Sequence, residues 1–338
     1  MSETEDSEWI PAPVLEETVE PLRPLIADAR WTSSLVAEQL LTDSEAFYAE
    51  WSPLHAQPPY AIYHYTDTVG LKGILESGQL RAADVTYLDG SREIGYAYGL
   101  VREQLHKRWR SNDRLVSEFC VQAELALDPR RWTRSLFIAS FCENGDALTQ
   151  WRTHGTDGAY AIGLRTGALD TVGVRLQRAE LRRVVYAADR QQALVQRMLD
   201  RAVNVVRSAH SLPEQERAGV VATVVEHLAD HFVELVATFK RPHLQEELEW
   251  RLAIALDPVY AGERTWQVQF AARDGHPVPY VDLDVSSRGG PAASPVAEVV
   301  CGPIDRSDLA ARSIQLMLRS RGNASARLRQ SALTQGNP

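Results

Sequence analysis

The sequence has few cysteines, no long apolar run and no excess of positive charge. Its three cysteines, Cys120, Cys142 and Cys301, lie far apart without any C-x-x-C spacing, so they support neither a disulfide framework nor a structural zinc site. No segment approaches the ~20 apolar residues that a membrane-spanning helix needs. The acidic start does not resemble a signal peptide. These absences predict a cytoplasmic protein with no membrane partner.

The charge balance and the missing glycine motifs argue against further classes of function. A net charge of -9 and a pI near 5.5 argue against a generally basic surface for nucleic acid. A local basic cleft stays open as an alternative, because Arg130, Arg131 and Arg134 cluster, as do Arg182 and Arg183. The chain has no P-loop and no G-x-G-x-x-G motif, so nothing favours a kinase-like or Rossmann protein.

Length and composition predict one main domain with appendages. A chain of 338 residues that is 44% hydrophobic can bury a full core. We expect residues 1–30 to be an acidic segment, disordered or loosely docked, and residues 31–59 to form a helix and a linker. A single α+β domain should span residues 60–320, with a helical insertion at about 190–240, followed by a polar tail at 321–338 that frays.

The stretch from residue 61 to residue 80 organises the rest of the prediction. Its β-rich start ends at Thr66 and Asp67, a pair suited to N-capping a helix. Apolar residues then follow at helical spacing, and Gly78 supplies a stop. His64 should therefore lie at the end of a strand, just before a helix N-terminus. At such a position a side chain can face a ligand, and nearby phosphate is favoured.

These residues resemble the start of a bacterial family catalogued as domain of unknown function 2971, whose members share a His-Tyr-Thr start, a short helix and a glycine stop. Three later stretches match as well: Tyr87-Leu88-Asp89 followed by Glu93, SFCENGDALTQWRTHG followed by YAIGL, and EELEWRL. The match covers roughly residues 60–319. The opening is also similar to the first strand and helix of ADP-ribosyltransferases of the His-Tyr-Glu type.

In those transferases a histidine holds the NAD ribose, tyrosines stack on nicotinamide, and a glutamate on a late strand drives transfer. The resemblance implies that NAD is the substrate and that His64 positions it, with Tyr65 and Thr66 beside it. Tyr87, Tyr96 and Tyr98 are candidates for stacking, since cation–π attraction to a flat cationic ring contributes roughly 0.5–2 kcal/mol. The alternative is that such tyrosines belong to the core.

Trp151 and Arg152 follow a predicted buried strand and a polar turn. A loop with these two side chains could form a wall for an adenine or phosphate group, because Arg152 offers a bidentate fork. Equally, Trp151 could simply close the end of the sheet.

Glu249 is the candidate catalytic carboxylate. Strand alternation places Glu247, Glu249 and Arg251 on one face. A carboxylate on an interior strand needs a partner or a cleft. The resemblance implies that Glu249 binds the ribose 2′-hydroxyl and stabilises the oxocarbenium ion formed as nicotinamide leaves. The register stays open, because Glu246 competes with Glu247 for the second acidic position. The alternative is a structural pair of Glu249 with Arg251 or Arg92.

No metal is expected. His227 and His231 are spaced to share a helical face, but Glu226 precedes the pair instead of lying inside it, and no third ligand is evident.

The predicted fold is α+β, with a mixed, mainly antiparallel sheet in two packed halves as in ADP-ribosyltransferases, and with a helical insertion. The predicted function is an NAD-dependent ADP-ribosyltransferase or NAD glycohydrolase that cleaves the nicotinamide–ribose bond. Its acceptor would be a protein, a nucleic acid or water. Two alternatives remain. One is a non-catalytic binding or immunity-type module on the same fold. The other is an RNA 2′-phosphotransferase-like enzyme, which needs several basic residues converging on the cleft.

Overall fold

The computed structural model describes residues 57–87, 90–129, 135–154, 160–169, 179–256, 267–273, 275–286, 295–303 and 307–333. The expected acidic segment at 1–30 and nearly all of the expected helix and linker at 31–59 lie outside the described residues. So do residues 88–89 and 287–294.

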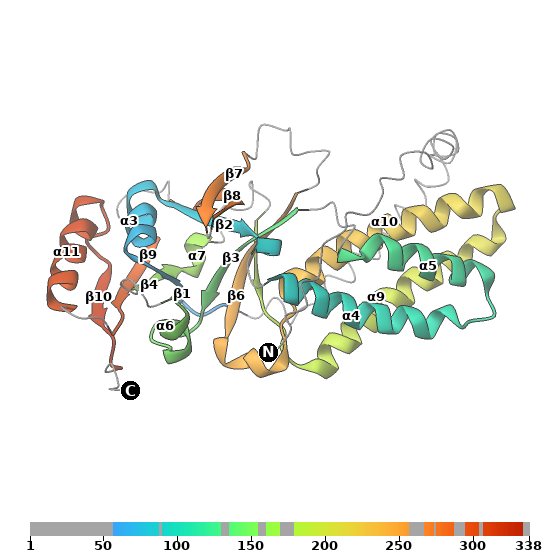
Figure 1. Ribbon diagram of the computed structural model, residues 1–338, viewed down its shortest axis with the longest axis horizontal. Coiled ribbons are helices and arrows are strands. Elements are labelled where there is room, and N and C mark those ends of the chain that lie inside the picture. Colours follow the sequence, from blue (N-terminus) through green and yellow to red (C-terminus); the bar gives the residue numbers. More distant parts are fainter. Residues whose placement is uncertain are drawn as a thin grey trace, which may run out of the picture.

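Within the described residues, ten strands form one open, mostly antiparallel sheet, in agreement with the α+β prediction (Figure 1). The strands are β1 (Ala61–Thr66), β2 (Gln79–Asp84), β3 (Ser135–Cys142), β4 (Tyr160–Arg165), β5 (Glu180–Arg183), β6 (Glu249–Leu256), β7 (Gln269–Arg273), β8 (His276–Asp284), β9 (Val296–Cys301) and β10 (Arg327–Gln330). Among the paired strands that the structure describes, only β9 and β10 run parallel.

The sheet forks at β3. One edge of β3 pairs with β6 along its whole length, from Ser135 opposite Leu256 to Cys142 opposite Glu249. The other edge is shared: β2 pairs at residues 137 and 138, and β1 pairs only at Cys142. Residues 139–141 lie between these two partners. The described strands therefore form one continuous sheet with two branches, β1-β4-β9-β10 and β2-β8-β7, in place of the two packed halves that were expected.

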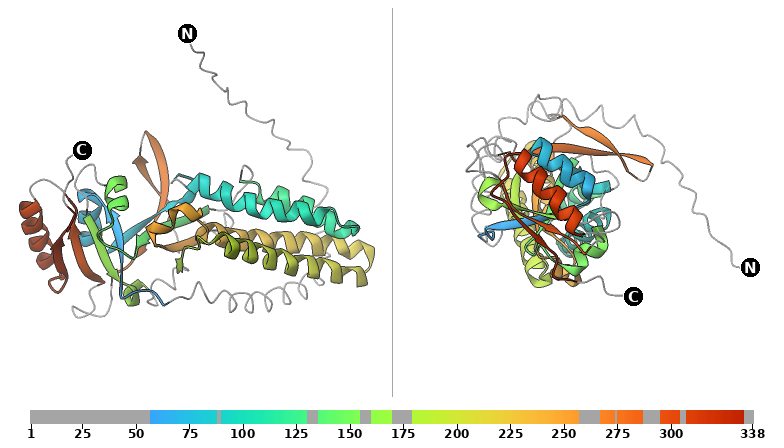
Figure 2. Two further views of the ribbon diagram at one scale, coloured as in Figure 1. Left: turned by 90° about the horizontal axis from the view of Figure 1, so that it is seen from below. Right: turned by 90° about the vertical axis from the view of Figure 1, so that its left-hand side faces the viewer.

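Four long helices form a lobe at one end of the sheet: α4 (Gly90–Trp109), α5 (Arg114–Leu127), α9 (Ala188–Ser208) and α10 (Glu214–Thr238). Figure 2 shows the α4–α5 hairpin lying along the α9–α10 hairpin. The helices predicted from the periodicity at 190–240 are α9 and α10. Their apolar faces share one core with α4, α5 and the side chains of Leu136, Ile138 and Ala253 from the sheet. The lobe is thus built from two separate insertions.

A second core lies on the other face of the sheet, under α3 (Thr68–Ser77) and α11 (Ser307–Ser320). The caps predicted for the first helix are present. The Asp67 carboxylate accepts a hydrogen bond from the Gly70 amide at 2.7 Å, and Gly78 ends α3 with a φ of 68°. The shorter helices are η3 (Val85–Tyr87), α6 (Leu148–His154), α7 (Thr166–Leu169), η5 (Ala209–Ser211) and η6 (Pro242–Glu247).

The tail after Arg321 differs from the expectation that it frays. Residues 327–330 form β10, which pairs with β9 from Arg327 opposite Glu298 to Gln330 opposite Cys301. The segment that follows reaches Asp146, whose carboxylate accepts hydrogen bonds from the Ser331 hydroxyl at 2.6 Å and the Ala332 amide at 2.8 Å. The tail has few apolar residues, so backbone pairing and this carboxylate hold it in place.

Candidate functional site

His64 lies where the sheet forks. Its Nδ1 is 2.9 Å from the carbonyl oxygen of Ser140, one of the three β3 residues that pair with neither β1 nor β2. Because a carbonyl only accepts, Nδ1 carries the proton in this contact. Burial lowers the pKa of His64 below its ordinary value, which favours the neutral imidazole at pH 7. The Nε2 lone pair then remains as an acceptor.

Ser140 connects His64 to Glu249. It is exposed, although most residues of β3 are buried and the strand lies inside the sheet. Solvent therefore reaches the middle of the sheet at the fork. The Ser140 carbonyl contacts His64, and the Ser140 side chain contributes to lowering the pKa of the Glu249 carboxyl. The two residues predicted to act on NAD are joined through this one serine.

Glu249 belongs to a buried network of charges that links the sheet to the helical lobe. Arg251 donates from Nε to Oε1 of Glu249 at 2.9 Å and from Nη2 to Glu93 on α4 at 2.7 Å. Lys240, just after α10, donates to Oε2 of Glu249 at 2.9 Å and also pairs with Glu247. The side chains of Glu249 and Arg251 are only 7% and 3% exposed. The predicted alternative of a Glu249–Arg251 pair is therefore present, within a larger network.

The two glutamates beside Leu248 have different protonation tendencies. Burial raises the pKa of Glu249, but Arg251 and Lys240 outweigh that effect and hold it at about 2. Burial raises the pKa of Glu247, and Lys240 only partly opposes the rise. Carboxyl groups whose environments separate their pKa values can take different roles in acid–base chemistry.

Leu248 itself has a φ of 45°, the only positive φ of a non-glycine residue in the described chain. This conformation is uncommon for a bulky side chain and is concentrated at functional sites. It turns the chain from η6 into β6, so that Glu247 and Glu249 both reach Lys240.

Tyr65 and Trp151 form a separate cluster. Their rings meet edge to face with centroids 4.6 Å apart, and the residues are 7% and 4% exposed. The Tyr65 hydroxyl donates to the carbonyl of Asn144 at 2.8 Å, and the Trp151 indole donates to Asp146 at 2.7 Å. Neither ring is exposed for stacking in this structure. Trp151 packs against Tyr65 near the end of β1, as expected if it closes the end of the sheet.

The remaining candidates are not gathered with His64. Tyr96 lies on α4 in the helical lobe, where its hydroxyl donates to Gln191 at 2.6 Å. Tyr87 is half exposed in η3, and Arg152 is exposed on α6. Thr66 follows His64 by two residues and is partly buried at the end of β1. Among the described residues, His64 and Glu249 both neighbour Ser140, His64 at its carbonyl and Glu249 at its side chain, and the candidate tyrosines do not line that position.

Sequence reasoning missed the roles of Ser140, Lys240 and Tyr186. Tyr186 accepts a hydrogen bond from the Glu249 amide at 3.1 Å through its hydroxyl. One signal could have revealed Ser140, because it is a polar residue inside the apolar run of β3. The other two lie next to Glu249 only through tertiary packing.

The other expectations concern basic residues, metals and membranes. Arg251 and Lys240 face carboxylates, so they do not present the free basic surface that an RNA 2′-phosphotransferase-like site needs. In the part of the chain that the structure describes, no three His, Cys, Asp or Glu side chains are grouped to hold a metal ion. Among the described helices, none combines the length and apolarity needed to cross a membrane.

No family model, no curated protein and no solved structure matches this chain. The resemblance to the domain of unknown function 2971 family and to ADP-ribosyltransferases therefore remains a prediction from the sequence motifs.

Proposed function

We propose that the protein cleaves the nicotinamide–ribose bond of NAD, as an ADP-ribosyltransferase or NAD glycohydrolase, at the fork of the sheet. One observation supports the proposal: His64 and Glu249, chosen from the sequence for this chemistry, both neighbour the exposed residue Ser140, His64 at its carbonyl and Glu249 at its side chain. The sequence motifs quoted above add the resemblance to transferases of the His-Tyr-Glu type.

The chemistry assigns each group a proton or a charge. Neutral His64 accepts a ribose hydroxyl at Nε2 while Nδ1 stays bonded to Ser140. The glycosidic bond breaks, its electron pair leaves with nicotinamide, and positive charge develops on the ribose. The ionised Glu249 stabilises that charge and binds the 2′-hydroxyl in place of the Ser140 hydroxyl. Water or an acceptor then attacks the ribose and loses a proton.

The test is nicotinamide release from NAD by the purified protein and by the variants Glu249→Gln and His64→Ala. Loss of an electrostatic stabiliser of a transition state lowers kcat by on the order of 10²-fold or more. Both variants should lose release while circular dichroism shows that they remain folded. Glu103→Gln is the matched control, because Glu103 is an exposed carboxylate paired with Lys107 on the surface of α4. It should release nicotinamide at the rate of the unmodified protein.

Ser140→Ala separates the two roles of the fork. The variant keeps the backbone carbonyl that contacts His64 and removes only the hydroxyl beside Glu249. A modest fall in kcat with little change in KM is then expected. Absence of both nicotinamide release and NAD binding by the unmodified protein would overturn the NAD proposal.

A second candidate is the non-catalytic binding module, which one observation favours. Both Glu249 oxygens already accept hydrogen bonds from Arg251 and Lys240, so the carboxylate is saturated by structural partners. This candidate predicts that calorimetry detects no NAD binding. It also predicts that Glu249→Gln changes the free energy of unfolding and nothing else.

A further inference from the structure

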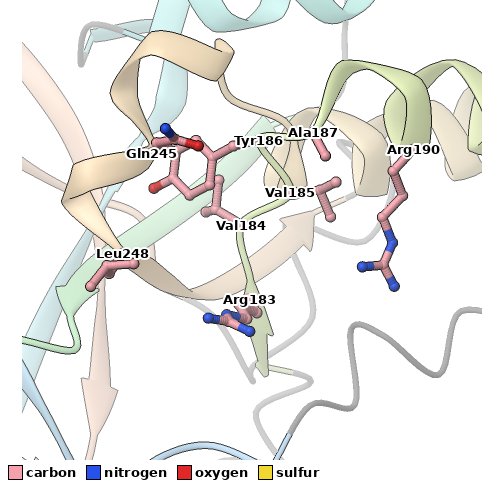
Figure 3. Close-up of a pocket in the computed structure, with 8 residues that line it drawn as sticks. All are labelled: Arg183, Val184, Val185, Tyr186, Ala187, Arg190, Gln245 and Leu248. Atoms are coloured by element: carbon pink, nitrogen blue, oxygen red, sulfur yellow. The ribbon is translucent and has the colours of Figure 1, made fainter.

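A pocket opens on the side of Glu249 away from the fork. Its volume is about 330 Å³, which lies at the lower end of the range of small-molecule sites. It is lined by the chain from β5 to the start of α9 and by η6, with the residues Arg183, Val184, Val185, Tyr186, Ala187, Arg190, Gln245 and Leu248 (Figure 3). The pocket and the fork are separated by β6 and β3.

Two guanidinium groups give the pocket its charge. Figure 3 shows Arg183 at the end of β5 and Arg190 on the first turn of α9. Arg183 is held by Glu143 at 3.2 Å and keeps a side-chain exposure of 44%. None of the described residues forms an ion pair with Arg190, which is exposed. One arginine is thus oriented by a carboxylate, and the other is available for a ligand.

The start of α9 adds partial positive charge to that of the two arginines. No side chain caps α9 at Ala187, which lies in the lining. The one carboxylate in the first turn, Asp189, accepts from the Arg190 amide at 2.8 Å. A long helix has partial positive charge at its start. Leu248, with its positive φ, places an apolar side chain that is 40% exposed in the same lining.

We propose that this pocket binds a small phosphate-bearing molecule. Arginine side chains bind phosphate oxygens bidentately through their planar fork, and two arginines suit a ligand with more than one phosphate. The Tyr186 hydroxyl and the Gln245 amide supply further polar groups beside an apolar wall. The volume fits a small molecule, and the net charge of -9 disfavours a long polyanion. Binding here does not require NAD cleavage.

Calorimetric titration with pyrophosphate tests the proposal on the full chain. The unmodified protein should bind pyrophosphate, and Arg190→Gln and Arg183→Gln should each weaken binding by about tenfold, because each removes a charge-assisted hydrogen bond. Arg207→Gln is the matched control, since Arg207 is exposed in the last turn of the same helix. It should bind as the unmodified protein does. The substituted side chains are all on the surface, so the variants should fold.

Three results would overturn the proposal. The first is no pyrophosphate binding by the unmodified protein. The second is an equal loss of binding in Arg190→Gln and Arg207→Gln, which would indicate a general charge effect. The third is tighter binding of a short single-stranded RNA than of pyrophosphate, with loss of RNA binding in Arg190→Gln, which would assign the pocket to nucleic acid.

Discussion

Two arginines in this protein pair with carboxylates inside polar clusters, and they differ in burial. Arg251 contacts Glu249 and Glu93 with a side chain that is 3% exposed. Arg329 contacts Asp146 at 3.4 Å and Glu298 at 3.2 Å with a side chain that is 35% exposed. Each arginine contacts two carboxylates. Arg251 is more desolvated than Arg329, so its loss should lower the free energy of unfolding by more.

The two clusters also differ in how their carboxylates are satisfied. Asp146 accepts from neutral donors, the Trp151 indole, the Ser331 hydroxyl and the Ala332 amide, besides its contact with Arg329. Glu249 relies mainly on charged donors. We therefore expect the Glu249 cluster to fail when one cation is removed, and the Asp146 cluster to tolerate the same loss.

The largest effect should come from Arg251→Met. It removes one of the two cations, Arg251 and Lys240, that pair with both Glu249 and Glu93, and breaking a buried pair costs about 3–5 kcal/mol. Urea denaturation would measure the fall in the free energy of unfolding. The double variant with Glu249→Gln should recover part of the loss, because it removes one of the stranded charges. A loss below about 1 kcal/mol, as at a surface pair, would contradict the comparison.

The second-largest effect should be a loss of stability in acid, which weakens the Glu249 cluster. Because the pKa of Glu249 is about 2 in the folded protein and 4.5 in the reference state, the folded chain binds fewer protons between these values. Its contribution is complete above about pH 4.5 and is lost as the pH falls toward 2. Glu247 has a raised pKa and contributes with the opposite sign. Melting temperatures measured between pH 2 and 7 should fall less steeply in Glu249→Gln.

A smaller effect is expected for Asp146→Ala. The change removes the acceptor of the Trp151 indole and of two donors in the C-terminal segment, and unsatisfied buried donors cost about 1–3 kcal/mol in total. Hydrogen exchange should show faster exchange in residues 327–332, because the segment loses its attachment. Unchanged protection there would mean that β10 is held by β9 alone.

The smallest effect is expected for Arg329→Gln. Its side chain is partly exposed and Asp146 keeps three neutral donors, so the loss should stay below about 1 kcal/mol. The same denaturation experiment measures it. If Arg329→Gln cost as much as Arg251→Met, burial would not be the deciding variable.

Residues next to each other in sequence were predicted well. The strand, cap and glycine stop at 61–78 agree with the structure, because alternation, an Asp N-cap and a left-handed glycine act within a few residues. Alternation on β6 also predicted that Glu249 and Arg251 share a face. No local pattern distinguishes the two positions predicted for Trp151, the wall of a ligand site and the end of the sheet, and its contact with Tyr65 depends on tertiary packing.

The α+β class and the helices at 188–208 and 214–238 could be predicted from the sequence, because short-range periodicity encodes them. His64 and Glu249 stay predictions that rest on the quoted motifs. Tertiary structure alone decided that α4 and α5 join α9 and α10 in one lobe, that the tail adds a strand, and that Ser140 joins His64 to Glu249. His64 and Ser140 are 76 residues apart in the sequence, and Glu93 and Arg251 are 158 residues apart. Such contacts depend on how whole elements pack, and a local pattern does not encode that packing.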